Sequence, residues 1–117
     1  MAGATIQAVD GRYLTPAPIN IAASGALIAA VSGQIIRVYR MLVVATSAVT
    51  VQFQDGATNL TGVMALAANE QLNLPMDGNP WFTTSAGNAF NVALGGAVNI
   101  SGCLYFTTTV SVGGVPL

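Results

Sequence analysis

The fold is decided by the stretch Val49-Thr50-Val51-Gln52-Phe53-Gln54-Asp55-Gly56. Apolar Val49, Val51 and Phe53 alternate with polar residues, which is the period of a β-strand that buries one face. The dipeptide Asp55-Gly56 follows at once and is typical of a tight turn. The stretch therefore predicts a strand that ends in a turn.

Outward from this stretch, further short apolar segments rich in Val, Ile and Thr are separated by turns that contain Gly, Asn or Pro. They predict strands at 34–46, 62–66, 71–74, 90–94 and 98–106. In 34–46 both alternating sets of positions are apolar around Arg37 and Arg40, which favours a strand in the middle of a sheet or beneath a partner subunit. Because Arg37 and Arg40 are three positions apart, we expect them on opposite faces, one toward a carboxylate of this chain and one toward a partner chain.

Gly95-Gly96 predicts a hairpin between the last two of these strands. A two-residue loop would place Val92 opposite Asn99 and mix polar with apolar faces. A three-residue loop, 95–97, pairs Val92 with Ile100 instead. We therefore expect the three-residue hairpin.

The chain of 117 residues is long enough for one hydrophobic core. Roughly eight to ten strands, with turns about every ten residues, favour an all-β fold, an antiparallel β-sandwich of jelly-roll type, with a barrel as the alternative. Pro16 and Pro18 interrupt the first part of the sequence. We therefore expect an extended N-terminal arm over residues 1–24 and a single sandwich domain over residues 25–117.

Charged residues make up 6% of the chain, where a soluble domain usually carries about 25%. The net charge of −1 and the lack of Lys disfavour binding to nucleic acid or to acidic membranes. The lack of His excludes Ser-His-Asp and Cys-His catalysis. The longest apolar stretch, 21–31, is shorter than the roughly 20 residues of a membrane helix, so we expect a soluble protein made inside the cell.

Candidate chemical sites have simpler explanations. Asp55-Gly56 and Asp77-Gly78-Asn79-Pro80 offer oxygen ligands for calcium, but turn chemistry explains both, and calcium usually takes about 6–8 oxygens. Trp81-Phe82 would suit either a sugar-stacking platform or a bulky plug at the end of the sandwich, and the small aromatic content favours the plug. Cys103 is expected to be a small buried side chain. We expect no cofactor, no metal and no enzymatic activity.

Segments 33–39, 49–56, 60–62, 74–82 and 85–89 carry a pattern of strand and turn residues that resembles the small β-domain virion proteins of tailed bacteriophages and prophages. Head decoration proteins, also called cement proteins, belong to this group. The resemblance covers roughly residues 23–106 and includes no catalytic motif. A surface with few charges also favours association with other subunits, because charge is what keeps most monomers apart.

The resemblance implies a decoration protein that binds the outer surface of the head and stabilises the lattice of the major capsid protein. It would be made in the host cytoplasm, act as a homotrimer at local three-fold positions, and bind neither nucleic acid nor membrane. The alternative is a receptor- or glycan-binding module of a tail fibre, with a polar pocket near Trp81. The expected capsid or subunit contacts are Ile6, Tyr13, Pro16, Pro18, Ile19, Arg37, Arg40, Met41, Trp81 and Phe82. The arm is expected to make contact by adding a strand to a neighbouring sheet.

Overall fold

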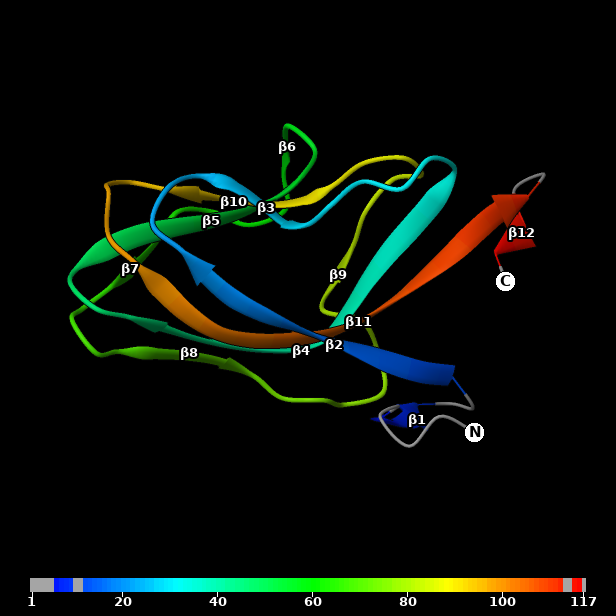
Figure 1. Cartoon of the computed structure of the whole chain (residues 1–117), viewed down its shortest axis with the longest axis horizontal. Coiled ribbons are helices and arrows are strands. Elements are labelled where there is room, and N and C mark those ends of the chain that lie inside the picture. Colours follow the sequence, from blue (N-terminus) through cyan, green and yellow to red (C-terminus); the bar gives the residue numbers. More distant parts are fainter. Residues whose placement is uncertain (1–5, 10–11, 113–114, 117) are drawn as a thin grey trace.

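The structure, a computed structural model, describes residues 6–9, 12–112 and 115–116, with side chains for 14–110. Two antiparallel sheets pack face to face as a sandwich (Figure 1). The larger sheet contains, in spatial order, β1 (Ile6–Val9), β2 (Arg12–Ile21), β11 (Ile100–Val112), β4 (Gln34–Ala45) and β8 (Gln71–Leu74), with β9 (Phe82–Thr83) beside β4 and β12 (Val115–Pro116) beside β11. The smaller sheet contains β3 (Gly25–Ile28), β10 (Phe90–Leu94), β5 (Val49–Asp55) and β6 (Thr58–Asn59), with β7 (Met64–Leu66) also beside β5.

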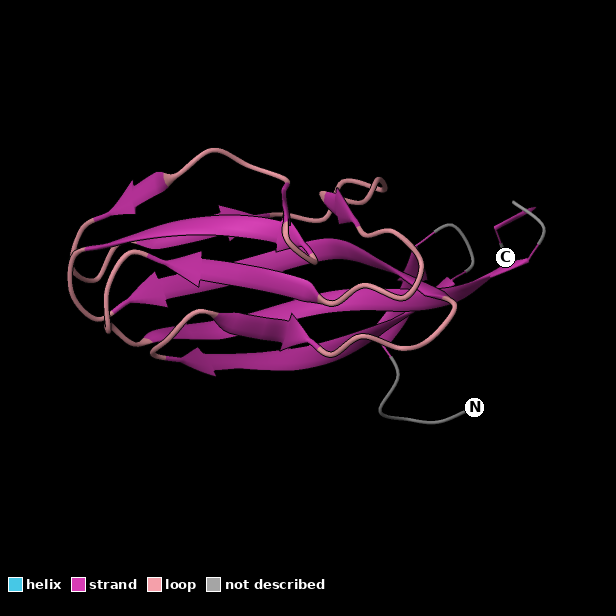
Figure 2. Cartoon of the chain, turned by 90° about the horizontal axis from the view of Figure 1, so that it is seen from above, coloured by secondary structure: helices cyan, strands magenta, loops and turns pink. Residues whose placement is uncertain are grey.

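The order of the strands is that of a jelly roll. Nested pairs run through the chain: β2 with β11, β3 with β10, β4 with β8, and β5 with β6 and β7. Successive pairs alternate between the two sheets, as in a long antiparallel ribbon that has been rolled up. Figure 2 shows the strands side by side with loops between them, and within the described ranges no helix is long and apolar enough to cross a membrane.

The strands β4 and β5 confirm the two strongest sequence predictions. Along β5, Val49, Val51, Phe53 and Asp55 are buried, and the residues between them are partly exposed. The strand β4 lies between β11 and β8, in the middle of its sheet. The inward side chains of both sheets form one core, which also contains Phe90 and Leu104.

A β-bulge at Tyr39 changes the faces of β4. Tyr105 pairs with Arg40, but the next residue, Phe106, pairs with Val38, so Tyr39 is an extra residue in the ladder. An extra residue shifts the alternation of side chains by one position. Arg37 and Arg40 consequently lie on the same, outer face of the sheet, and the prediction of opposite faces is wrong.

The predicted hairpin at 95–97 is also wrong. The strand β10 pairs with β3 and β5 in the smaller sheet, whereas β11 pairs with β2 and β4 in the larger one. The chain therefore crosses between sheets after Leu94, so Val92 lies opposite neither Ile100 nor Asn99. The prediction failed because it assumed that the two strands pair with each other in one sheet. In the structure β10 has β3 on one side and β5 on the other.

Much of the expected arm belongs to the sandwich. Residues 15–21 of β2 pair continuously with β11, and Leu14 and Ile19 are buried. Pro16 and Pro18 are compatible with this position because β2 is open on its other side along these residues, where a proline nitrogen needs no partner. The expectation of an arm outside the sandwich is therefore wrong for 14–21, and residues 1–5 and 10–11 lie outside the described residues.

Candidate interaction face

One surface of the larger sheet combines apolar side chains with a cation. It is formed by outward-pointing residues of β2, β11 and β4, and we call it the Arg40 face. Its residues are Pro16, Pro18, Arg40, Leu42, Cys103 and Tyr105. Both prolines are exposed, and the other four side chains are partly exposed.

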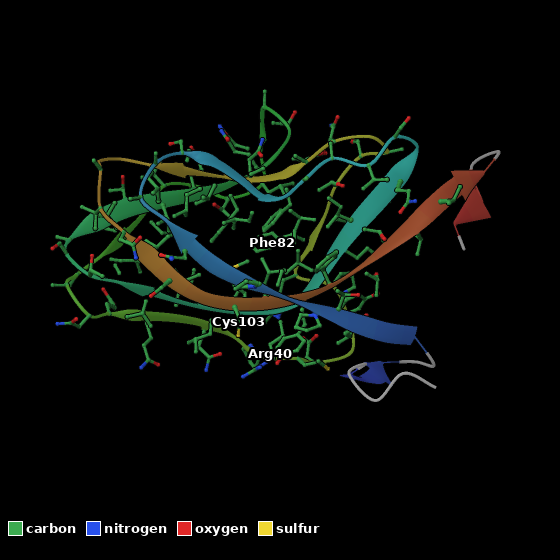
Figure 3. The ribbon with its side chains drawn as sticks, viewed as in Figure 1. Arg40, Phe82 and Cys103 are labelled. Atoms are coloured by element: carbon green, nitrogen blue, oxygen red, sulfur yellow. The ribbon has the colours of Figure 1, made fainter. Side chains whose placement is uncertain are left out.

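Strand register arranges this face in two rows. Tyr105 on the central strand lies opposite Pro16 on one side and Arg40 on the other. In the next row Cys103 lies between Pro18 and Leu42. Figure 3 shows Arg40 and Cys103 on the outer side of the larger sheet, whereas Phe82 points between the two sheets. The face is thus a continuous patch across three strands.

Arg40 is held by an aromatic ring and by no carboxylate. Its guanidinium carbon lies 5.3 Å from the centroid of the Tyr105 ring, within the range of a cation–π contact. Among the side chains of residues 14–110, Arg40 makes no ion pair. The planar donors of its guanidinium group suit a carboxylate, so the face offers a positive charge for which the described part of the chain supplies no counter-charge.

Arg37 and Thr109 extend the same surface, and Thr107 lies buried between them. Arg37 lies opposite Thr107, and its Nη1 atom donates a hydrogen bond to Thr109 Oγ1 at 2.5 Å. The Thr107 side chain is 7% exposed, and its hydroxyl makes no hydrogen bond within the described part of the molecule. Both cations whose side chains are described therefore lie on one face of one sheet.

The outer face of the smaller sheet is different in character. Its central residues on β5 are Thr50, Gln52 and Gln54. Gln52 Nε2 donates to the carbonyl of Thr61 at 3.0 Å, and Gln54 Nε2 donates to Asn59 Oδ1 at 2.9 Å. The side-chain amides of Gln52 and Gln54 thus bond to their own sheet and its loops. This face therefore has fewer free polar groups for a partner than the Arg40 face has.

The buried carboxylate Asp55 fastens the end of β5 to the loop that follows β9. It accepts hydrogen bonds from Ser85 N at 3.0 Å, Ser85 Oγ at 2.9 Å and Asn88 Nδ2 at 2.9 Å. Burial raises the pKa of Asp55, but the hydrogen bonds from Asn88 and Ser85 outweigh burial and hold the pKa below its ordinary value of 3.8. These contacts fit a structural carboxylate rather than an acid–base catalyst.

The other described carboxylates also serve turns. Glu70 Oε1 accepts a hydrogen bond from Ala67 N at 2.7 Å, and Asp77 Oδ1 accepts one from Asn79 N at 3.0 Å. In residues 14–110 no three His, Cys, Asp or Glu side chains gather where a metal ion could bind.

Three of the expected contact residues face the core. Ile19 and Met41 belong to the core, and Phe82 packs there with ring centroids 5.3 Å from both Phe53 and Phe90. These three side chains face the interior, so the sequence-based expectation that they contact a partner is wrong. The sequence could not show this, because in a strand that is apolar on both faces the residues of the inner face have the same character as those of the outer face.

The other expected residues have different positions. Pro16, Pro18, Arg37 and Arg40 lie on the outer face of the larger sheet. The side chains of Ile6 and Tyr13 lie outside the described part of the chain. Tyr105 belongs to the face and was missed, and Cys103, which was expected to be buried, is partly exposed on it.

Trp81 follows Pro80 in the loop that leads into β9. Its side chain is 41% exposed, and the indole Nε1 donates to the carbonyl of Pro75 at 2.7 Å. Two shallow pockets, of about 330 Å³ and 140 Å³, lie near Gly95 and Val63, and Trp81 lines neither of them. Neither pocket has a titratable lining residue.

Comparisons with protein-family models, with curated proteins and with solved structures found no match for this chain.

Proposed function

We propose that this chain is a non-enzymatic structural protein of a bacteriophage virion. It is a decoration protein that binds the outer surface of the head and stabilises the lattice of the major capsid protein, as a homotrimer at local three-fold positions. The observation that carries the proposal is the Arg40 face: an open sheet face in which apolar residues surround an arginine without an ion-pair partner in the described structure.

Physical arguments support a binding role over a catalytic one. Protein interfaces are enriched in Tyr and Arg, and partly apolar faces on proteins with few charges tend to be covered by other subunits. Asp55, Glu70 and Asp77 each accept hydrogen bonds within turns or loops of this chain. The choice of the capsid protein as partner follows from the resemblance of the strand and turn pattern to phage virion proteins.

The test is co-sedimentation of the purified protein with capsid shells that lack it, followed by cryo-electron microscopy of the pelleted shells. We expect saturable binding and symmetric density at the local three-fold positions. Shells that already carry the protein are the control and should bind no more. If the shells bind none and the protein is found on tails or on host glycans instead, the decoration function is wrong.

A further inference from the structure

We infer that the Arg40 face is the docking surface for the shell, and that it recognises a carboxylate displayed by the capsid protein. This inference rests on the proposed function and assigns the site through which that function is carried out. Arg40 is the central contact, and Arg37 with Thr109 extends it along the sheet.

The distribution of charge points to an acidic partner. Arg37 and Arg40 lie on this face, whereas the carboxylates of Asp55, Glu70 and Asp77 all bond within turns or loops elsewhere. A carboxylate on the partner would therefore meet a cation with no competing anion among the described side chains. A guanidinium group can bind a carboxylate through two parallel hydrogen bonds, which fixes orientation as well as charge.

The surroundings of Arg40 favour a protein surface over other anions. Tyr105 lies under the guanidinium group, and the adjacent row of Pro18, Cys103 and Leu42 offers apolar contact. Tyr and Arg anchors beside apolar residues are typical of the residues that dominate binding at protein interfaces. A nucleic acid needs several cations along its backbone, and this chain has three in total with a net charge of −1.

Among the carboxylates of residues 14–110, none is free to serve as the counter-charge on a second copy, which favours a different protein as the partner. Glu70 and Asp77 are exposed, but each already accepts a backbone hydrogen bond in its own turn, and Asp55 is buried. Two parallel hydrogen bonds from Arg40 would need both oxygens of one carboxylate, and in Glu70 and Asp77 one oxygen already accepts the hydrogen bond of a turn. The shell is therefore the occupant that we assign.

The test compares two variants with the same net charge. Arg40→Gln removes the cation, and Asn59→Asp adds one negative charge on β6, at the edge of the opposite sheet, where it keeps an oxygen that can accept from Gln54. We expect Arg40→Gln to weaken binding to shells at least about tenfold and Asn59→Asp to change it less than about twofold. Urea unfolding of each variant checks that the fold is retained.

A second measurement leaves the protein unchanged. Shells are treated with carbodiimide and ethanolamine, which converts exposed carboxylates to neutral amides, and wild-type binding is measured again. We expect a loss of at least about tenfold, as for Arg40→Gln. This result would support the inference even if Arg40→Gln failed to fold.

The outcomes separate the two proposals. If the wild type does not bind shells, the decoration function fails, and this inference fails with it. If the wild type binds but Arg40→Gln or amidated shells bind as well as the unmodified pair, the inference alone is wrong. Three further outcomes would overturn the inference about the Arg40 face. In the first, both variants weaken binding equally. In the others, Arg40→Gln disrupts an oligomer of the isolated protein, or the face binds DNA instead.

Discussion

Gly102 is the third residue of β11 and has a backbone φ of +149°, a conformation that side chains rarely allow. A Cβ atom there would lie 1.9 Å from the carbonyl oxygen of Leu42. We expect Gly102→Ala to lower the free energy of unfolding by at least about 2 kcal/mol, because strain and a clash with the backbone add together. Gly96→Ala is the control, since nothing lies within 4 Å of its added Cβ. Equal urea midpoints for the two variants would contradict this reading.

Asp55 gives the protein a predictable response to acid. Its pKa is lowered in the folded state, so its contribution to stability is present above about pH 3.8 and is lost as the pH falls through the lower folded pKa. Asp55→Asn should cost about 1–3 kcal/mol at neutral pH, because an amide group cannot accept all the hydrogen bonds from Ser85 and Asn88.

Urea unfolding at a series of pH values checks this prediction. The difference in stability between wild type and Asp55→Asn should shrink as the pH falls below 3.8. Asp77→Asn serves as the control, because Asp77 is exposed and accepts a single hydrogen bond, from Asn79. A pH-independent difference would show that ionisation of Asp55 is not what stabilises the loop.

At the scale of elements, the bulge at Tyr39 lets β4 bury apolar side chains both before and after the bulge along the chain. Deleting Tyr39 would turn Ile36 and Val38, which are fully buried, toward the outer face or force the strand to slip. We expect a loss of about 3–6 kcal/mol, the value for exposing two such side chains. Deleting exposed Ala30 in the loop before β4 is the control. A Tyr39 deletion as stable as the Ala30 deletion would disprove the importance of the bulge.

At the scale of the whole molecule, the low charge of the chain predicts that the proposed binding to shells resists salt. The proposed docking surface contributes apolar area and one or two arginines, and pairs that exclude water are screened little. We expect the affinity for shells to change less than about tenfold between about 0.15 M and about 1 M NaCl in the co-sedimentation assay. Release of the protein at modest salt would indicate an interface dominated by exposed charges.

The sequence alone predicted the local structure and part of the candidate site. Short-range patterns in the sequence predicted the alternation in β5, the turn at Asp55-Gly56 and the central place of β4. The structure has all three, because the packed core keeps these apolar residues on the inner faces. Arg37 and Arg40 were identified as candidates because they interrupt an otherwise apolar strand. Their common face was not predictable, since a single extra residue at Tyr39 reverses the alternation without leaving a clear mark in the sequence.

The sequence by itself determined that the chain forms strands, where many of them lie and that they make a sandwich with few charges. Only the tertiary structure decided which sheet each strand joins. It sends β10 and β11 to different sheets, places β2 against β11, and turns Ile19, Met41 and Phe82 toward the core. The physical reason is that alternation of apolar and polar residues shows only that a strand has two different faces. Packing between residues far apart in the chain decides which strands become its neighbours and which face turns to the core.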